Sequence, residues 1–285
     1  MKSWGMVWIM SFSALLGGCT PNIVTSNLGL VDVVTSDLVS PPYEDHPNIQ
    51  AAEIARRRGD VPQAIRDYRD IIKQCPGCEK AYVGLGMSLI DANALVEAKN
   101  TFEKAITLFP RSSRVYAGLG LVYILVDQPE NAINSFDGAL KLNPRNANAY
   151  NGYGMALDMI DEHETAQANY RAALELDPTN ISYESNLALS MALCGNVHEA
   201  IHILERLVRS PNVTPRIRQN LSLAYGLAGD MKMAKKIGRM DLPDDMVMNN
   251  VTYFEAVQQT REYSGLIPKD HTTPLDETRK WQERN

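Results

Sequence analysis

The sequence predicts an all-α protein, a superhelical solenoid of about six helix pairs with a C-terminal capping helix. The first observation is an alanine at every thirty-fourth position: Ala64, Ala98, Ala132, Ala166, Ala200 and Ala234. An aromatic residue follows each of the first four alanines by four positions, and a proline follows each aromatic by eight. Such a fixed register is typical of stacked helix pairs, because one pair alone cannot bury its apolar face.

Each position in the register has a physical reason. Small residues let the two helices of a pair approach closely, and the aromatic ring fills the space beside them: Tyr68, Phe102, Phe136 and Tyr170. Proline cannot continue a helix, so it ends the second helix of each pair. Together with Tyr82-x-x-Leu85-Gly86 and its recurrences, this pattern resembles the tetratricopeptide repeat. The resemblance implies a concave groove lined by the first helix of every pair.

The N-terminus predicts export and lipidation. Lys2 precedes an apolar run from Trp4 to Leu16, which is too short to span a bilayer and indicates a signal peptide over residues 1–18. Leu16-Gly17-Gly18-Cys19 resembles a bacterial lipobox, which implies lipidation of Cys19. Thr20, in place of Asp, then implies the periplasmic face of the outer membrane. An ordinary signal peptide with a chance cysteine is the alternative.

The remaining chain divides by composition and periodicity. We expect a lipidated flexible tether over residues 19–47, which carry four prolines, and the repeat solenoid over 48–242. Apolar residues at steps of four, three and three predict a capping helix over 243–263. The proline-containing, charged residues 264–285 are expected to be a disordered tail.

Charge and motifs exclude several classes of ligand. The formal net charge is −6 and the pI about 5.4, so no basic face suited to nucleic acid is expected. The Gly-x-Gly triplets at 84–86, 118–120 and 152–154 lie within predicted helices and follow no strand, so they are not nucleotide loops. We therefore expect no cofactor and no small-molecule substrate.

The groove is expected to be apolar with a few amides. Projecting the first helices at steps of three and four residues gives the expected peptide-binding lining: Val83, Met87, Ile90, Ala117, Leu121, Ile124, Asn151, Met155, Asp158, Ser185, Leu189 and Ala192. The resemblance adds Asn186 and Asn220, which stand where related grooves grip a peptide backbone. An apolar lining with methionines suits an amphipathic helix or hydrophobic segment of a partner. Packing between neighbouring repeats is the alternative for any single residue.

The first glycine of each triplet leaves two interpretations open. Gly84, Gly118 and Gly152 would each cost roughly 1 kcal/mol relative to alanine inside a helix. They could leave bare backbone on the groove floor for a closely approaching ligand, or they could allow adjacent repeats to pack.

Two motifs suggest a metal site or a redox site, but the repeat pattern accounts for the residues of both. His198-Glu199-Ala200-Ile201-His202 matches the zinc-protease motif, but its central residue is a repeat alanine and no third ligand follows. We expect no metal site there. Cys75-Pro76-Gly77-Cys78 contains the repeat's own proline, so we expect a turn or a local disulfide, with a thiol oxidoreductase as the enzymatic alternative.

Residues 218–250, "RQNLSLAYGLAGDMKMAKKIGRMDLPDDMVMNN", resemble the end of TadD-type tetratricopeptide lipoproteins of the tight-adherence (Flp) pilus system. The resemblance implies a non-enzymatic scaffold or pilotin that acts on the outer-membrane secretin and other pilus assembly proteins. An adaptor for envelope proteases or peptidoglycan enzymes is the alternative within the binding class.

Overall fold

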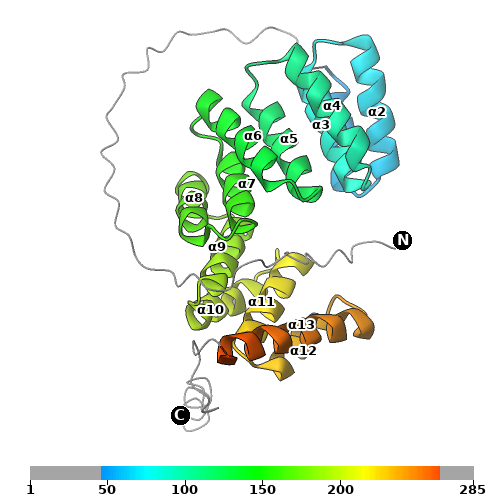
Figure 1. Ribbon diagram of the computed structural model, residues 1–285. Helices are drawn as coiled ribbons and strands as arrows, with labels where there is room; N and C mark the ends of the chain where they lie inside the picture. The colour runs from blue at the N-terminus through cyan, green and yellow to red at the C-terminus, as the bar shows by residue number, and fades with distance from the viewer. Residues whose placement is uncertain (1–45, 264–285) are drawn as a thin grey trace. The chain divides into compact units, whose positions relative to one another are not determined.

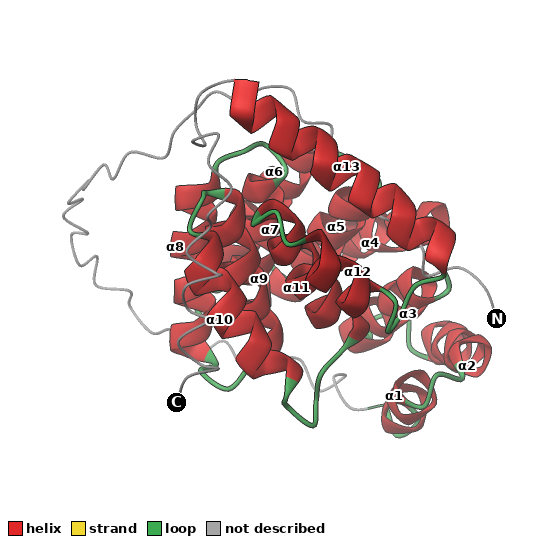
Figure 2. Ribbon diagram, turned by 90° about the horizontal axis from the view of Figure 1, so that it is seen from below, coloured by secondary structure: helices red, strands yellow, loops and turns green. Residues whose placement is uncertain are grey.

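The computed structural model describes residues 46–263, and within them it is all-α (Figures 1 and 2). The predicted fold class is confirmed, because the described helices form successive pairs followed by one further helix. The helices are α1 (Ile49–Arg57), α2 (Val61–Gln74), α3 (Glu79–Asp91), α4 (Leu95–Leu108), α5 (Ser113–Leu125), α6 (Pro129–Leu142), α7 (Ala147–Asp158), α8 (His163–Leu176), α9 (Ile181–Leu193), α10 (Val197–Val208), α11 (Pro215–Leu227), α12 (Met231–Gly238) and α13 (Asp244–Tyr263). The signal peptide, Cys19, the predicted tether before residue 46 and the predicted tail lie outside the described residues. None of the described helices is long and apolar enough to cross a membrane.

The described chain falls into two compact units. We call residues 46–190 the N-terminal unit and residues 191–263 the C-terminal unit. The division falls within α9, and each unit is described by itself below.

The turns inside the pairs repeat as regularly as the helices do. Between the first and second helix of every pair, one residue adopts a positive φ, and these residues are 34 positions apart: Gly59, Asn93, Asp127, Asp161, Gly195 and Gly229. Glycine, asparagine and aspartate are the residues that adopt this left-handed conformation at least cost. Side chains then cap several helices, as where Asp60 accepts a hydrogen bond from the Gln63 amide and Asp230 one from the Met233 amide.

The repeat register also forms the core. The repeat alanines are at most 1% exposed, and the four aromatic side chains that follow them are at most 2% exposed. Around Phe102 and Tyr68, one apolar cluster extends from Ile49 to Val122. The residues that define the repeat are therefore the residues that hold neighbouring helices together.

The last helix, α13, closes the C-terminal unit. Its buried face consists of Val247, Val251, Phe254 and Val257. The Phe254 ring lies against Gly226, where an added Cβ would be 2.3 Å from the ring. The Gln258 amide donates to the carbonyls of Gly226 and Leu227, which lie in the last turn of α11 and have no further turn of that helix to bond to.

Replacing Phe254 by alanine should release this helix. The free energy needed to open α13 locally should fall by about 2 kcal/mol. This value is in the low part of the range for truncated buried side chains, because a terminal helix can shift into the vacated space. Hydrogen exchange should show faster exchange of α13 amides and unchanged exchange in the N-terminal unit. Met248→Ala, which truncates an exposed side chain of the same helix, is the control. Equal effects of the two substitutions would contradict this packing.

Candidate functional site

The first helices of the N-terminal unit form its inner row. In this unit α1 contacts α3, α3 contacts α5 and α5 contacts α7, whereas no two of the second helices α2, α4, α6 and α8 contact each other. When neighbouring pairs contact each other through their first helices and not through their second helices, the stack of pairs curves toward the first helices. The first helices therefore line the concave face of this unit, as the repeat pattern predicts.

The predicted apolar lining is partly present on this face. Val83, Met87 and Ile90 on α3 are half-buried and pack on the core with their inner sides. Leu121 on α5 and Met155 on α7 are also half-buried. Ala117 and Leu189 have the same intermediate exposure.

Several residues predicted to line the groove are in fact buried. Ile124 is 1% exposed and Asp158 is 5% exposed, and both occupy the same repeat position in the last turn of a first helix. Ile124 packs in one cluster with Ala132 and Phe136 of α6, and Asp158 contacts His163 and Tyr170 of α8, so each side chain enters the core beside its own second helix. Asn186 is also buried, and its amide donates to Asn151 Oδ1 over 2.9 Å. Ser185 is buried too, and in the C-terminal unit Ala192 and Asn220 are likewise buried.

A cavity of about 210 Å³ lies at the N-terminal end of the concave face, and we call it the N-terminal cavity. Its lining comes from three successive first helices and from α2: Glu53, Arg56, Tyr68, Lys80, Val83, Gly84, Met87 and Arg114. The apolar residues Val83 and Met87 were predicted, whereas the three cationic side chains were not. Lys80 and Arg114 are 34 positions apart, so the repeat register contained a signal for this basic edge.

Ion pairs hold the two arginine side chains beside the cavity. Arg56 Nη1 lies 3.0 Å from Asp91 Oδ2, and Arg114 Nε lies 3.0 Å from Glu79 Oε1. At the floor, burial raises the pKa of the Tyr68 hydroxyl to about 12, and the nearby Glu53 carboxylate acts in the same direction. Tyr68 therefore remains a protonated hydrogen-bond donor at neutral pH.

The structure decides between the two interpretations of the glycines in favour of packing. A Cβ added to Gly118 would lie 2.2 Å from Phe102 Cε1, and one added to Gly152 would lie 2.3 Å from Phe136 Cε1. A Cβ on Gly84 would lie 2.2 Å from Tyr68 Cζ. Each glycine thus accommodates the aromatic ring of the preceding repeat, and close approach of a ligand is not its reason.

A buried polar cluster, which the repeat pattern did not predict, joins α7, α8 and α9. Asp158 accepts hydrogen bonds from the Tyr170 hydroxyl at 2.8 Å and the Ser190 hydroxyl at 2.7 Å, and its Oδ1 is 2.8 Å from His163 Nδ1. Burial raises the pKa of the Asp158 carboxyl, and the three hydrogen bonds oppose that rise in part. Ser190 bonds to the aspartate and not to the imidazole nitrogen, so this is not the arrangement of a catalytic triad.

The zinc-protease motif has no metal-site geometry. His198, Glu199 and His202 are not brought together with a third ligand, and all three lie on the outer part of α10, outside its buried face. Within residues 46–263, no three His, Cys, Asp or Glu side chains come together in a way that could hold a metal ion.

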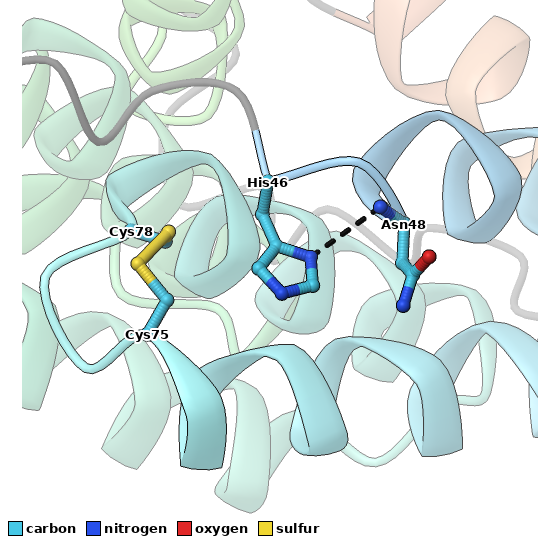
Figure 3. Close-up of a disulfide and its surroundings, with 4 residues drawn as sticks. All are labelled: His46, Asn48, Cys75 and Cys78. Atoms are coloured by element: carbon cyan, nitrogen blue, oxygen red, sulfur yellow. Dashed lines mark hydrogen bonds between the residues drawn. A yellow bond between two sulfur atoms is a disulfide. The ribbon is translucent and has the colours of Figure 1, made fainter.

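Cys75 and Cys78 form a disulfide, with their Cα atoms 5.5 Å apart (Figure 3). Cys75 follows the last residue of α2 and Cys78 precedes the first residue of α3, so the bond joins the ends of two consecutive helices. Cys78 is 1% exposed, which leaves little access for a substrate thiol. In Figure 3 the disulfide lies near His46 and Asn48, where His46 Nδ1 accepts a hydrogen bond from the Asn48 amide.

Comparison with known proteins agrees with the repeat assignment. Residues 49–113 and 118–181 match the tetratricopeptide-repeat family model. No curated protein matches the chain significantly.

Three solved structures illustrate the similarity in fold. PilW, a widely conserved type IV pilus biogenesis factor, is 19% identical with a TM-score of 0.57, over 67% of this chain and 88% of that chain. A thermophilic repeat protein of Thermus thermophilus is 19% identical with a TM-score of 0.56, over 62% of this chain and 96% of that chain. A repeat protein of Parabacteroides merdae is 14% identical with a TM-score of 0.58, over 73% of this chain and 82% of that chain. At these identities the similarity concerns the fold alone.

Proposed function

We propose that this chain, whose residues 49–113 and 118–181 match the tetratricopeptide-repeat family model, is a scaffold for the assembly of a Flp-type pilus and binds the secretin through its concave face. Proteins of this repeat family are typically non-enzymatic scaffolds that bind other proteins. The choice of partner rests on the resemblance of residues 218–250 to TadD-type lipoproteins. PilW shares the fold and acts in type IV pilus biogenesis, and that role accords with the proposal.

The observation that carries the proposal is the apolar row on the concave face. Val83, Met87, Leu121 and Met155 come from three successive first helices, and each leaves part of its side chain exposed. Contiguous exposed apolar surface on a folded protein usually marks an interaction site. A partner segment bound there would bury side chains worth roughly 1.5 to 3 kcal/mol each, so two or three contacts could supply most of the affinity.

Placing charges in this row should abolish secretin binding. Leu121→Asp combined with Met155→Asp should lower the affinity by at least about tenfold, because two carboxylates would have to lose water against an apolar segment. Binding of purified protein to detergent-solubilised secretin is the measurement, with circular dichroism to check helical content.

Val96→Asp is the matched control, since Val96 is an apolar residue that is 75% exposed on the second helix α4. It should bind secretin like the wild type. Normal binding by the folded double variant would show that the partner binds another surface.

We further propose that the scaffold is held by lipid at Cys19 on the periplasmic face of the outer membrane. Several acyl chains at about 0.8 kcal/mol per buried CH₂ would make the attachment almost permanent. Cys19→Ser should abolish labelling by radioactive palmitate and move the protein to the soluble periplasmic fraction. Labelling and membrane fractionation that survive the substitution would contradict the lipid anchor.

A further inference from the structure

We propose that the N-terminal cavity binds an acidic segment of the same chain, residues 28–39, which precedes α1. The inference depends on the concave face being a binding surface, as in the proposed function. It adds that this acidic segment occupies one end of that surface and competes with a partner for it.

The cavity is built to hold a carboxylate beside aliphatic side chains. Its lining carries three cationic side chains, Arg56, Lys80 and Arg114, against one carboxylate, Glu53. Asp91 and Glu79 neutralise part of this charge through their ion pairs with the arginines. A guanidinium has five N–H donors, so Arg56 can bind Asp91 through one of them and still donate to a second carboxylate.

A hydroxyl group in the floor points to the same ligand. Tyr68 is 1% exposed, yet its side chain lines the cavity, and its hydroxyl makes no hydrogen bond to any residue between 46 and 263. The hydroxyl is not a buried unsatisfied group, so it is open to the cavity, and an acceptor bound there could take its hydrogen bond in place of water. Val83 and Met87, both half-buried beside it, provide the apolar wall.

The acidic segment has the complementary composition. Residues 20–45 contain four carboxylates, Asp32, Asp37, Glu44 and Asp45, and no lysine or arginine. Within residues 28–39, aliphatic residues stand directly beside both aspartates, as in Val31-Asp32-Val33 and Asp37-Leu38-Val39. The acidic segment can therefore present a carboxylate to the basic edge and aliphatic groups to Val83 and Met87 together.

The connection to α1 is long enough. Glu53 and Arg56 of α1 line the cavity, and the helix from Ile49 to Arg56 rises by only about 10 Å. The seven residues from Val39 to His46 can span up to about 23 Å. The acidic segment can thus turn back along α1 and reach the cavity.

Carbodiimide cross-linking of the full chain tests the proposal, because this reagent joins a carboxylate directly to a lysine amine. Peptide mass spectrometry of the monomeric product should identify an amide between Lys80 and Asp32 or Asp37. Lys80→Arg keeps the charge but has no amine, so it should lose this link. The double variant Asp32→Asn/Asp37→Asn should lose it as well.

Hydroxyl-radical oxidation of Met87 provides a second measurement that needs no lysine. Oxidation should be low in the wild type and rise several-fold in Asp32→Asn/Asp37→Asn, while oxidation of the exposed Met240 stays the same. Lys80 links to Asp270 or Asp276 would instead make the C-terminal tail the occupant, and links found only in a dimeric product would indicate a second copy. Absence of these links with unchanged Met87 oxidation would leave the cavity to an external partner. Each of these three outcomes overturns the proposal.

Failure here can be told apart from failure of the proposed function. If the acidic segment does not bind but Leu121→Asp/Met155→Asp still loses secretin, only the present inference is wrong. If the link forms and secretin never binds the concave face, the proposed function is wrong. If both are correct, Asp32→Asn/Asp37→Asn should bind secretin more tightly than the wild type does.

Discussion

Gly118→Ala is expected to destabilise the N-terminal unit by about 3 kcal/mol or more, although it adds a single methyl group. The new Cβ would lie 2.2 Å from Phe102 Cε1. The ring has little room to move away, because Gly86 of α3 also packs closely against it: a Cβ added there would lie 2.4 Å from Phe102 Cζ. Phe102 is also fully buried, so relief requires separating two repeats. Urea unfolding followed by circular dichroism measures the loss.

Two further variants isolate the clash from the change of helix propensity. Gly138→Ala also replaces a helical glycine, but its Cβ would lie 3.2 Å from the half-buried Tyr116 ring, so its stability should change by no more than about 1 kcal/mol. Phe102→Leu should recover part of the stability lost in Gly118→Ala, because leucine removes the ring atoms nearest the new methyl group. A Gly118→Ala protein as stable as the wild type but unable to bind its partner would restore the ligand interpretation of these glycines.

The fold could be predicted from the sequence because its determinants recur. A single residue such as Ala98 or Phe102 says little about the fold. The same residue type at the same position in several repeats is compatible with one architecture only. The positive-φ turn residues, such as Asn93 and Asp127, carry the same 34-residue signal. They mark the turn of each pair, because few residue types other than glycine, asparagine and aspartate tolerate that conformation.

The candidate site was predicted less completely, and the reasons are physical. Lys80 and Arg114 lie three residues before the predicted Val83 and Ala117, but the projection began one turn later and so left out these long side chains, which reach the cavity. Ile124 and Asp158 were wrongly predicted to line the groove, because the projection of a single helix leaves out the second helix above its last turn. Asp158 stands where Ile90 and Ile124 stand in earlier repeats, and a carboxyl group at an aliphatic position indicates a buried polar cluster.

Asp158→Ala should cost the N-terminal unit about 3 kcal/mol or more, because it removes the shared acceptor of a buried cluster in which each unsatisfied donor costs about 1 to 3 kcal/mol. Tyr170, Ser190 and His163 each direct a polar atom at this carboxyl group, and all three are buried. Hydrogen exchange should locate the loss in α7, α8 and the part of α9 up to Ser190. Asp158→Asn keeps one acceptor oxygen at nearly the same volume and should lose far less.

The same pair of proteins, wild type and Asp158→Asn, should differ in the pH dependence of unfolding. Because burial raises the folded-state pKa of Asp158 above its ordinary value, its contribution to stability is fully present below about pH 4 and is lost as pH rises through the raised pKa. Asparagine does not titrate, so the free energy of unfolding of the wild type, measured relative to Asp158→Asn, should fall as the pH rises above about 4. A difference that rises with pH would mean that the three hydrogen bonds outweigh burial and hold Asp158 as a carboxylate.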